Sequence, residues 1–160
     1  MEDHSDCLFC KFAKKELDTE IIYENKYVFA FLDINPAGQL VGHTLVVPKK
    51  HFENIDTADE KYVCEAMKAI KKVVPAIRKI SGADGINVLQ NNGKVAGQAI
   101  PHLHFHIIPR KHNDGIRFDE NRRYYKPLEM CETAKELRKE LGTGSDYPKK
   151  QLCEGSVSKP

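Results

Sequence analysis

Three histidines stand at alternating positions in the segment PHLHFHII, residues 101–108, with one apolar residue between each pair. Successive side chains of a β-strand point to opposite faces, so His102, His104 and His106 share one face of a predicted strand over residues 102–108. Imidazole titrates near neutral pH and serves as a base, a nucleophile or a metal ligand. This histidine motif is therefore the first candidate for a functional site.

The spacing of the motif leaves two uses of its imidazoles open. Alternate residues of a strand lie roughly 6.6 Å apart and the outer two roughly 13 Å, so a single ion can hardly reach all three rings. One motif histidine could instead complete a zinc site with Cys7, Cys10 and His51, because zinc takes four ligands from Cys and His. The C-x-x-C pair could also be a redox pair or two reduced thiols without metal. A zinc site would leave two histidines for other chemistry.

The loop before the motif, NNGKVAGQAIPH, supplies amide side chains and glycines but no carboxylate. Asn91 and Gln98 offer hydrogen-bond donors, and Gly93 and Gly97 allow the backbone to approach a ligand closely. Donors beside a neutral imidazole suit an acyl or phosphoryl centre, where negative charge develops on oxygen. Attack of an imidazole on phosphorus would form a covalent phosphoramidate. The structural alternative is that the histidines are exposed and have no function.

The elements that must position these residues follow from apolar patterns and turn signals. EIIYENKYVFAFLDI predicts a hairpin, and Thr57 with Glu60 forms a capping-box pattern at the start of a long amphipathic helix. A second helix begins after Pro127. The predicted strands cover about residues 20–24, 27–32, 43–47, 85–91 and 102–108, and the predicted helices about 57–81 and 127–141.

The length and charge of the chain limit the classes of function that we expect. We expect one domain over residues 1–141, followed by a polar, disordered tail over residues 142–160. The chain has 25 basic and 23 acidic residues, a net charge of +2, so no global field would recruit nucleic acid or an anionic membrane. It has no stretch long enough to span a bilayer and no signal peptide at its start. We expect a cytoplasmic protein, with the nucleus possible.

The five cysteines are odd in number and widely spread, so we expect no disulfide framework. Cys64 and Cys131 are predicted to be small core residues or residues on a helix face.

With these residues in view, the chain resembles the histidine triad family, whose motif is His-φ-His-φ-His-φ-φ with φ apolar. The motif stands here as HLHFHII, and CLFC, FLDI, GHTLVVPKKH, NNG and AGQ occur in the family's order over roughly residues 5–110. The resemblance implies an α+β fold with an antiparallel five-stranded sheet, a long helix and a C-terminal helix. It also implies a homodimer that pairs the two sheets.

The resemblance further implies hydrolysis of nucleoside-phosphate-X conjugates through a covalent nucleotidyl-histidine. His104 would attack the α-phosphate, His106 would contact phosphate oxygens, and His43 would orient His106. Gln98 matches a position that holds phosphate oxygens or the leaving group, so we place it with these catalytic residues.

Substrate binding is implied for further positions of the family pattern. Asp33 matches the acid that binds ribose hydroxyls, although an ordinary strand-end cap is the alternative. Asn91, like Gln98, matches a position that holds phosphate oxygens or the leaving group. Phe9 and Phe31 lie near the matched segments as candidate walls for a base, although core packing would explain them equally well.

Zinc-bearing members of the family use C-x-x-C, the histidine of KKH and the first motif histidine. Transferred here, the Zn²⁺ ligands are Cys7, Cys10, His51 and His102. The metal would be structural, because four protein ligands leave no open position.

The sequence differs from each branch of the family in features that relate to the substrate. The chain has no Trp, whereas the animal phosphoramidase branch carries one near its C-terminus, and PRK after the motif looks like the diadenosine polyphosphate branch. These departures leave the leaving group open, and the expected function is still a purine nucleoside phosphoramidate hydrolase. The alternatives are a diadenosine polyphosphate hydrolase and a nucleotide-binding adaptor.

Overall fold

The computed structural model describes residues 4–118, 125–126 and 128–143. The chain divides into two compact units, Met1–Ile116 and Arg117–Pro160, which are described separately. The placement of residues 1–141 in one domain stays a prediction. Most of the expected tail, residues 144–160, lies outside the described residues.

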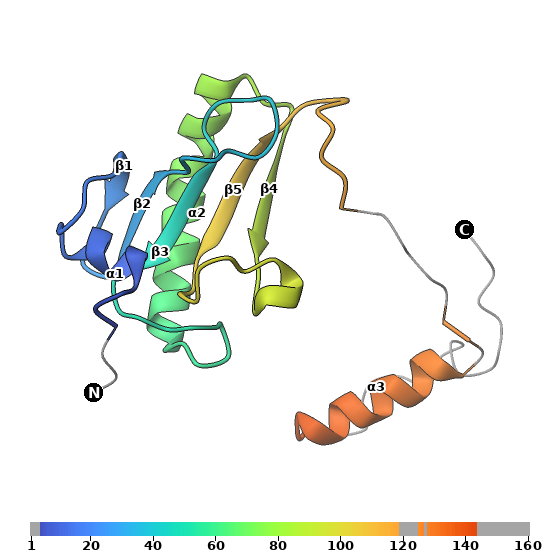
Figure 1. The fold of residues 1–160 in the computed structure, drawn as a ribbon. Helices are drawn as coiled ribbons and strands as arrows, with labels where there is room; N and C mark the ends of the chain where they lie inside the picture. Colours follow the sequence, from blue (N-terminus) through green and yellow to red (C-terminus); the bar gives the residue numbers. More distant parts are fainter. Residues whose placement is uncertain (1–3, 119–124, 127, 144–160) are drawn as a thin grey trace. The chain divides into compact units, whose positions relative to one another are not determined.

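The first unit is built on a five-stranded antiparallel sheet with the order β1-β2-β3-β5-β4 (Figure 1). This confirms the expected α+β class, the sheet and the long helix. The elements are α1 (Leu8–Ala13), β1 (Ile21–Glu24), β2 (Val28–Leu32), β3 (Thr44–Pro48), α2 (Glu60–Ser81), β4 (Gly85–Gln90), a 3₁₀ turn η1 (Lys94–Ala96) and β5 (Phe105–Arg110).

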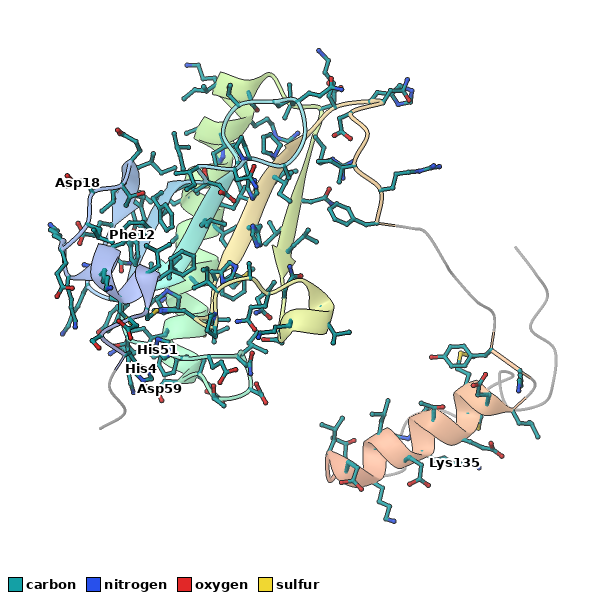
Figure 2. All side chains as sticks on the ribbon, in the orientation of Figure 1. His4, Phe12, Asp18, His51, Asp59 and Lys135 are labelled. Carbon is teal, nitrogen blue, oxygen red and sulfur yellow. The ribbon has the colours of Figure 1, made fainter. Side chains whose placement is uncertain are left out.

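Alternation along the strands separates two apolar layers. Val28, Ala30 and Val46 point toward α2, which crosses one face of the sheet (Figure 1). Their neighbours belong to a second cluster on the opposite face, which consists of Phe9, Phe29, Phe31, Leu45 and Val47. Residues of α1, including Phe12 (labelled in Figure 2), pack against this second cluster. The central strands are buried on both faces, which explains their unbroken apolar runs.

The predicted capping box at the start of the long helix is wrong. The N-cap residue is Asp59, whose side chain accepts a hydrogen bond from Lys50 Nζ (2.8 Å) and makes none to the helix. The Thr57 hydroxyl lies two residues before the cap and donates to the Asn54 carbonyl (3.1 Å). The other end agrees with the sequence, because α2 ends at Ser81 and Gly82 adopts φ = 65°, a conformation that glycine favours.

The histidine strand is shorter than predicted, since β5 begins at Phe105 rather than at residue 102. The preceding segment is held differently, by a hydrogen bond from the Leu103 amide to the Phe52 carbonyl (2.6 Å). Alternation continues nevertheless, because Leu103, Phe105 and Ile107 all belong to the α2-facing cluster. The three histidines therefore lie on the opposite face, where His106 pairs with Leu45 of β3.

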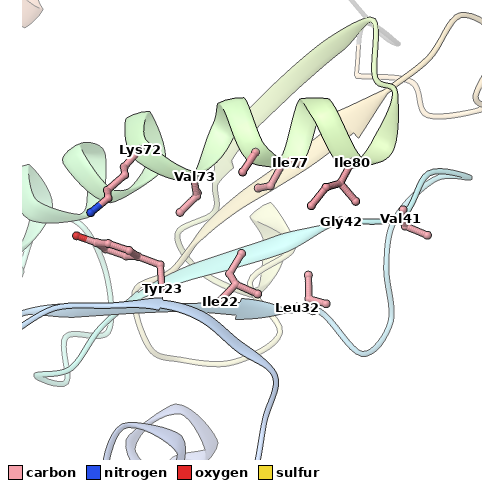
Figure 3. A pocket seen from close by; sticks show the side chains of 10 residues that line it. Ile22, Tyr23, Leu32, Val41, Gly42, Lys72, Val73, Ile77 and Ile80 are labelled. Carbon is pink, nitrogen blue, oxygen red and sulfur yellow. The ribbon is translucent and has the colours of Figure 1, made fainter.

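An apolar groove of about 510 Å³ lies at the edge of the α2-facing layer (Figure 3). Ile22 and Leu32 line one side of it, and Val73, Ile77 and Ile80 of α2 line the other. Because it opens on the α2 face, this groove is separate from the histidines.

The described part of the second unit contains the expected C-terminal helix, α3 (Glu129–Glu140). Cys131 of α3 is buried and disulfide-bonded, although we expected no disulfide framework. Cys64 of α2 is exposed and has a free thiol. Across residues 4–118, 125–126 and 128–143, no helix has the length and apolar character needed to span a membrane.

The loop that leaves β5 is fastened by one carboxylate. Asp114 accepts hydrogen bonds from Arg110 Nε (2.6 Å) and Nη2 (2.8 Å), and from the backbone amides of Lys111 and Ile116 (both 3.0 Å). Arg110 also donates to the Asn87 side chain in β4. The hydrogen bonds from the Arg110 guanidinium hold the pKa of Asp114 well below its usual range.

We predict that Asp114→Asn lowers Tm at pH 7 and weakens its pH dependence in acid. A carboxyl group whose folded pKa is depressed adds stability above its unfolded pKa of about 3.9, and this stability disappears as the pH falls through the folded pKa. The Tm values of wild type and variant should therefore begin to converge below about pH 4 and meet only as the pH falls through the folded pKa. Thermal unfolding at several pH values measures this. A Tm difference that stays constant with pH, or an equal effect of Asp56→Asn at an exposed position, would contradict the prediction.

Candidate functional site

The first cluster brings together the four residues predicted to bind zinc. The ligand atoms of Cys7, Cys10, His51 and His102 all lie within 4.8 Å of one another. Cys7 is the residue before α1, and Cys10 lies in the first turn of that helix. His51 follows β3, and His102 precedes β5. Three segments distant in sequence therefore meet at one point.

Hydrogen bonding orients His102 toward the sulfur atoms. Its Nε2–H donates to the Pro48 carbonyl (2.9 Å), so the neutral ring has its lone pair on Nδ1. That nitrogen lies 3.3 Å from Cys7 Sγ and 3.7 Å from Cys10 Sγ. Burial lowers the His102 pKa to about 4, which keeps the ring neutral. A carbonyl behind the distal nitrogen is the usual arrangement for a metal-binding imidazole.

The donor set fits a tetrahedral zinc ion. Bonds of about 2.3 Å to sulfur and 2.0–2.1 Å to nitrogen place neighbouring ligand atoms about 3.3–3.8 Å apart. The two Cys–His102 distances fall in this range, as does the 3.4 Å between Cys10 Sγ and His51 Nδ1. Burial and the neighbouring Cys7 raise the pKa of Cys10 to about 12, so its thiolate needs a cation beside it. The cluster could therefore hold a metal with all four positions filled.

The second cluster contains the remaining motif histidines. His104 is 4% exposed, and its Nδ1–H donates to the His102 carbonyl (2.7 Å), which leaves the lone pair on Nε2. Burial lowers the His104 pKa, so the ring stays neutral near pH 7. A neutral imidazole with a fixed tautomer and a free lone pair is suited to act as a nucleophile.

His106 is held in the opposite tautomer by a chain of hydrogen bonds. The Ala37 amide donates to His43 Nδ1 (2.8 Å), so neutral His43 carries its proton on Nε2 and donates it to His106 Nδ1 (3.0 Å). His106 therefore presents Nε2–H. Burial lowers the pKa of both rings, that of His106 to about 4. The centroids of the His104 and His106 rings are 4.9 Å apart, so a ring with a free lone pair stands next to a ring with an N–H donor.

Asp33 lies at the end of β2, beside this chain of hydrogen bonds. Its Oδ2 is 3.6 Å from His43 Nδ1, but that nitrogen already accepts the Ala37 amide, so we read the contact as electrostatic only. Asp33 Oδ1 accepts the Asn35 amide (2.9 Å), as expected for a turn cap. The other carboxylate oxygen has no hydrogen bond to the protein among those described. Asp33 therefore caps the turn through one oxygen, and its second oxygen could accept a hydrogen bond from a ligand.

The Gln98 side chain has fewer groups available to bind a ligand than the sequence suggests. It is 5% exposed, its Nε2 donates to the Glu53 carbonyl (2.8 Å), and its Oε1 accepts the Gly93 amide (2.6 Å). These bonds close the loop before the motif and leave one amide proton. Asn91 is partly exposed in the same loop, and its side-chain amide lies beside Gly97.

Phe9 and Phe31 are both 3% exposed and belong to the apolar cluster beside α1. The Phe9 ring packs edge-on against His104 (centroids 5.3 Å apart) and against His102 (5.8 Å). Phe31 packs on Phe9 and Phe12. Core packing thus accounts for both residues, and Phe9 also contacts the histidine site.

Several contributors to the site carry no sequence signal. Three are backbone groups: the Pro48 carbonyl, the His102 carbonyl and the Ala37 amide. Backbone groups are present at every residue, so only the fold identifies them. His4 stacks on His51 (centroids 3.7 Å apart), and both are labelled near the N-terminal segment in Figure 2. The early histidine in MEDHSD was the only available hint of that contact.

Comparisons of the sequence with known proteins identify a family and several relatives. The model of the HIT domain matches residues 14–113. An uncharacterized HIT-like protein of Methanocaldococcus jannaschii is 45% identical over 134 residues, which cover 82% of this chain and 98% of that protein. An adenosine 5′-monophosphoramidase of Saccharomyces cerevisiae is 40% identical over 105 residues, which cover 66% of this chain and 63% of that enzyme.

The fold comparison leads to the same family. A crystal structure of a HIT family member from Bacillus subtilis superposes with a TM-score of 0.77 at 36% identity, and it covers 84% of this chain and 96% of that one. The family model covers most of the first unit, including the cluster of His43 and His106 and the motif histidines. The chain therefore belongs to the histidine triad (HIT) family.

Proposed function

We propose that this protein hydrolyses nucleoside-phosphate-X conjugates at the α-phosphate, with purine nucleoside phosphoramidates as the substrate class. The observation that carries the proposal is the pair of hydrogen bonds at His104 Nδ1 (2.7 Å) and His106 Nδ1 (3.0 Å), from which opposed tautomers of the two neutral rings follow. Family membership and the yeast phosphoramidase relative support nucleotide hydrolysis in general.

The chemistry would proceed in two displacements. His104 Nε2 attacks the α-phosphorus, a P–N bond forms and the P–X bond breaks, and X leaves with its electron pair and takes up a proton from solvent. Water then attacks the phosphorus and gives up a proton to solvent, the P–N bond breaks with its electron pair returning to Nε2, and nucleoside monophosphate and free His104 result. His106 Nε2–H would donate to a phosphate oxygen as negative charge develops, and His43 would hold His106 in that tautomer. Gln98 and Asn91 are proposed to contact the phosphate or the leaving group.

Two other functions are kept as alternatives. A diadenosine polyphosphate hydrolase would use the same displacement with a nucleotide as X. A nucleotide-binding adaptor would need residues that bind the nucleotide but no nucleophile with a fixed lone pair, so the His104 geometry favours an enzyme. Turnover of a panel containing phosphoramidates, adenylyl sulfate and diadenosine polyphosphates would separate the three.

We predict that His104→Asn reduces kcat by several orders of magnitude, because the nucleophile is lost. Nucleoside monophosphate should still bind with an affinity close to that of wild type, since the other proposed binding residues remain. Rapid acid and alkaline quenching of wild type should reveal an acid-labile nucleotidyl adduct on His104. His112→Asn, at an exposed position, is the matched control and should turn over normally. An adduct on another residue, or normal turnover by His104→Asn, would refute the assignment.

We predict that Asp33→Asn lowers kcat/KM on ribonucleotide substrates about tenfold or more, and less on 2′-deoxy analogues. A carboxylate that accepts bonds from ribose hydroxyls contributes roughly 1.5–3 kcal/mol through charge-assisted bonds. The substituted Asn keeps an oxygen for the Asn35 amide, so the turn should survive. The ratio of ribo to deoxy kcat/KM is the measured quantity. Equal losses on the two sugars would leave Asp33 with its capping role alone.

We predict one equivalent of zinc per chain, held by Cys7, Cys10, His51 and His102. The ion closes a tetrahedral site that joins three segments, so binding should contribute to folding stability. Elemental analysis after purification without chelator should give about one zinc per chain. Cys10→Ser should lose the metal and lower Tm, whereas the exposed Cys64→Ser should do neither. Metal-free wild type, or full metal content in Cys10→Ser, would refute the site.

The homodimer and the cytoplasmic location, with the nucleus possible, stay predictions. β4 is an edge strand of the sheet, so it offers free backbone groups along which two sheets could pair.

A further inference from the structure

The metal-ligand cluster and the proposed nucleophile are connected through His102. The side chain of His102 lies among the cysteines, with Nδ1 3.3 Å from Cys7 Sγ. The backbone carbonyl of the same residue accepts the His104 Nδ1–H at 2.7 Å. Whatever fixes the His102 side chain therefore also fixes the acceptor that selects the His104 tautomer.

A second connection runs through α1. Phe9 lies between Cys7 and Cys10 in the C-x-x-C segment, and its ring contacts both His102 and His104 edge-on. A ligand bridge to the two sulfur atoms would hold the first turn of α1, and with it this ring, against the sheet. Phe12, one turn further along, packs on Phe9 and Phe31 and has no ring contact with a histidine among the described residues.

We propose that Phe9 and the Cys7–Cys10–His51–His102 cluster are positioning residues for His104, so that metal binding orders the nucleophile as well as the fold. The inference rests on the proposed role of His104 and adds a function to a site that would otherwise be structural only. The metal takes no part in the reaction. Its effect is transmitted by the His102 carbonyl and by the Phe9 ring.

The physical reason is the choice between two neutral tautomers. A His104 ring with no fixed acceptor at Nδ1 would populate both tautomers, and the one with Nε2–H has no lone pair directed at the substrate. Displacement of a reacting group by about 1 Å can cost as much as a hundredfold in rate. Loosening of the cluster should therefore lower kcat more than it raises KM.

Side-chain ¹⁵N NMR of the full-length protein with labelled histidine tests the proposal at one fixed pH. In zinc-loaded wild type, His104 should show a protonated Nδ1 and an unprotonated Nε2. Removal of zinc with a chelator, or Cys10→Ser, should shift both nitrogens toward a mixture of tautomers. Phe9→Leu keeps all four ligands, so it should retain zinc, show a partial shift and lose about tenfold to a hundredfold in kcat.

Phe12→Leu is the matched control, since it removes a ring from the same helix and the same apolar cluster. It should leave the His104 shifts unchanged. Unchanged shifts in both the zinc-free protein and Phe9→Leu would overturn the proposal, as would equal shifts in Phe9→Leu and Phe12→Leu. If the zinc-free protein unfolds, Phe9→Leu alone decides. Absence of turnover in zinc-loaded wild type would instead reject the proposed function and leave the NMR result interpretable.

Discussion

The two-residue alternation of the segment from His102 to Ile107 is the constraint on which the site depends. Leu103, Phe105 and Ile107 are buried against α2, so the histidines between them must project from the other face. A shift of register by one residue would place the imidazoles in the apolar core beneath α2 and put three large apolar side chains where the histidines now lie. The energy of the α2-facing core thus holds the histidines in place, although none of them contributes to that core.

Burial gives these histidines a second property, which is neutrality. Desolvation lowers the pKa of His43, His102, His104 and His106, and for two of them the value is about 4. A neutral imidazole has one donor and one acceptor, so a single hydrogen bond at one nitrogen decides what the other nitrogen can do. The Pro48 carbonyl leaves a metal-binding Nδ1 on His102, and the His102 carbonyl leaves a lone pair on Nε2 of His104. Identical side chains thereby acquire different chemistry.

The second apolar layer explains why α1 matters to a site on the sheet. α1 is six residues long, too short to be stable alone, and it is held by Phe9 and Phe12 packing on Phe31. The ligand cluster lies at its first turn, where Cys7 and Cys10 meet His51 and His102. Apolar packing and metal coordination would therefore anchor the same short helix at two points, next to His104.

The hairpin, the long helix up to Gly82, the five strands and the shared face of the histidines were predictable from the sequence, because each follows from local alternation or helical spacing. Its C-x-x-C spacing and HLHFHII motif also indicated the residues that the fold brings together. Packing in space settles that β5 begins at Phe105, that Gln98 closes its own loop, and which nitrogen of His102 and of His104 keeps its lone pair. The partners that settle these points, such as the carbonyls of Pro48 and Glu53 and the Ala37 amide, are backbone groups that every residue carries. Their effect depends on where the fold places them, and local residue type and spacing do not reveal that placement.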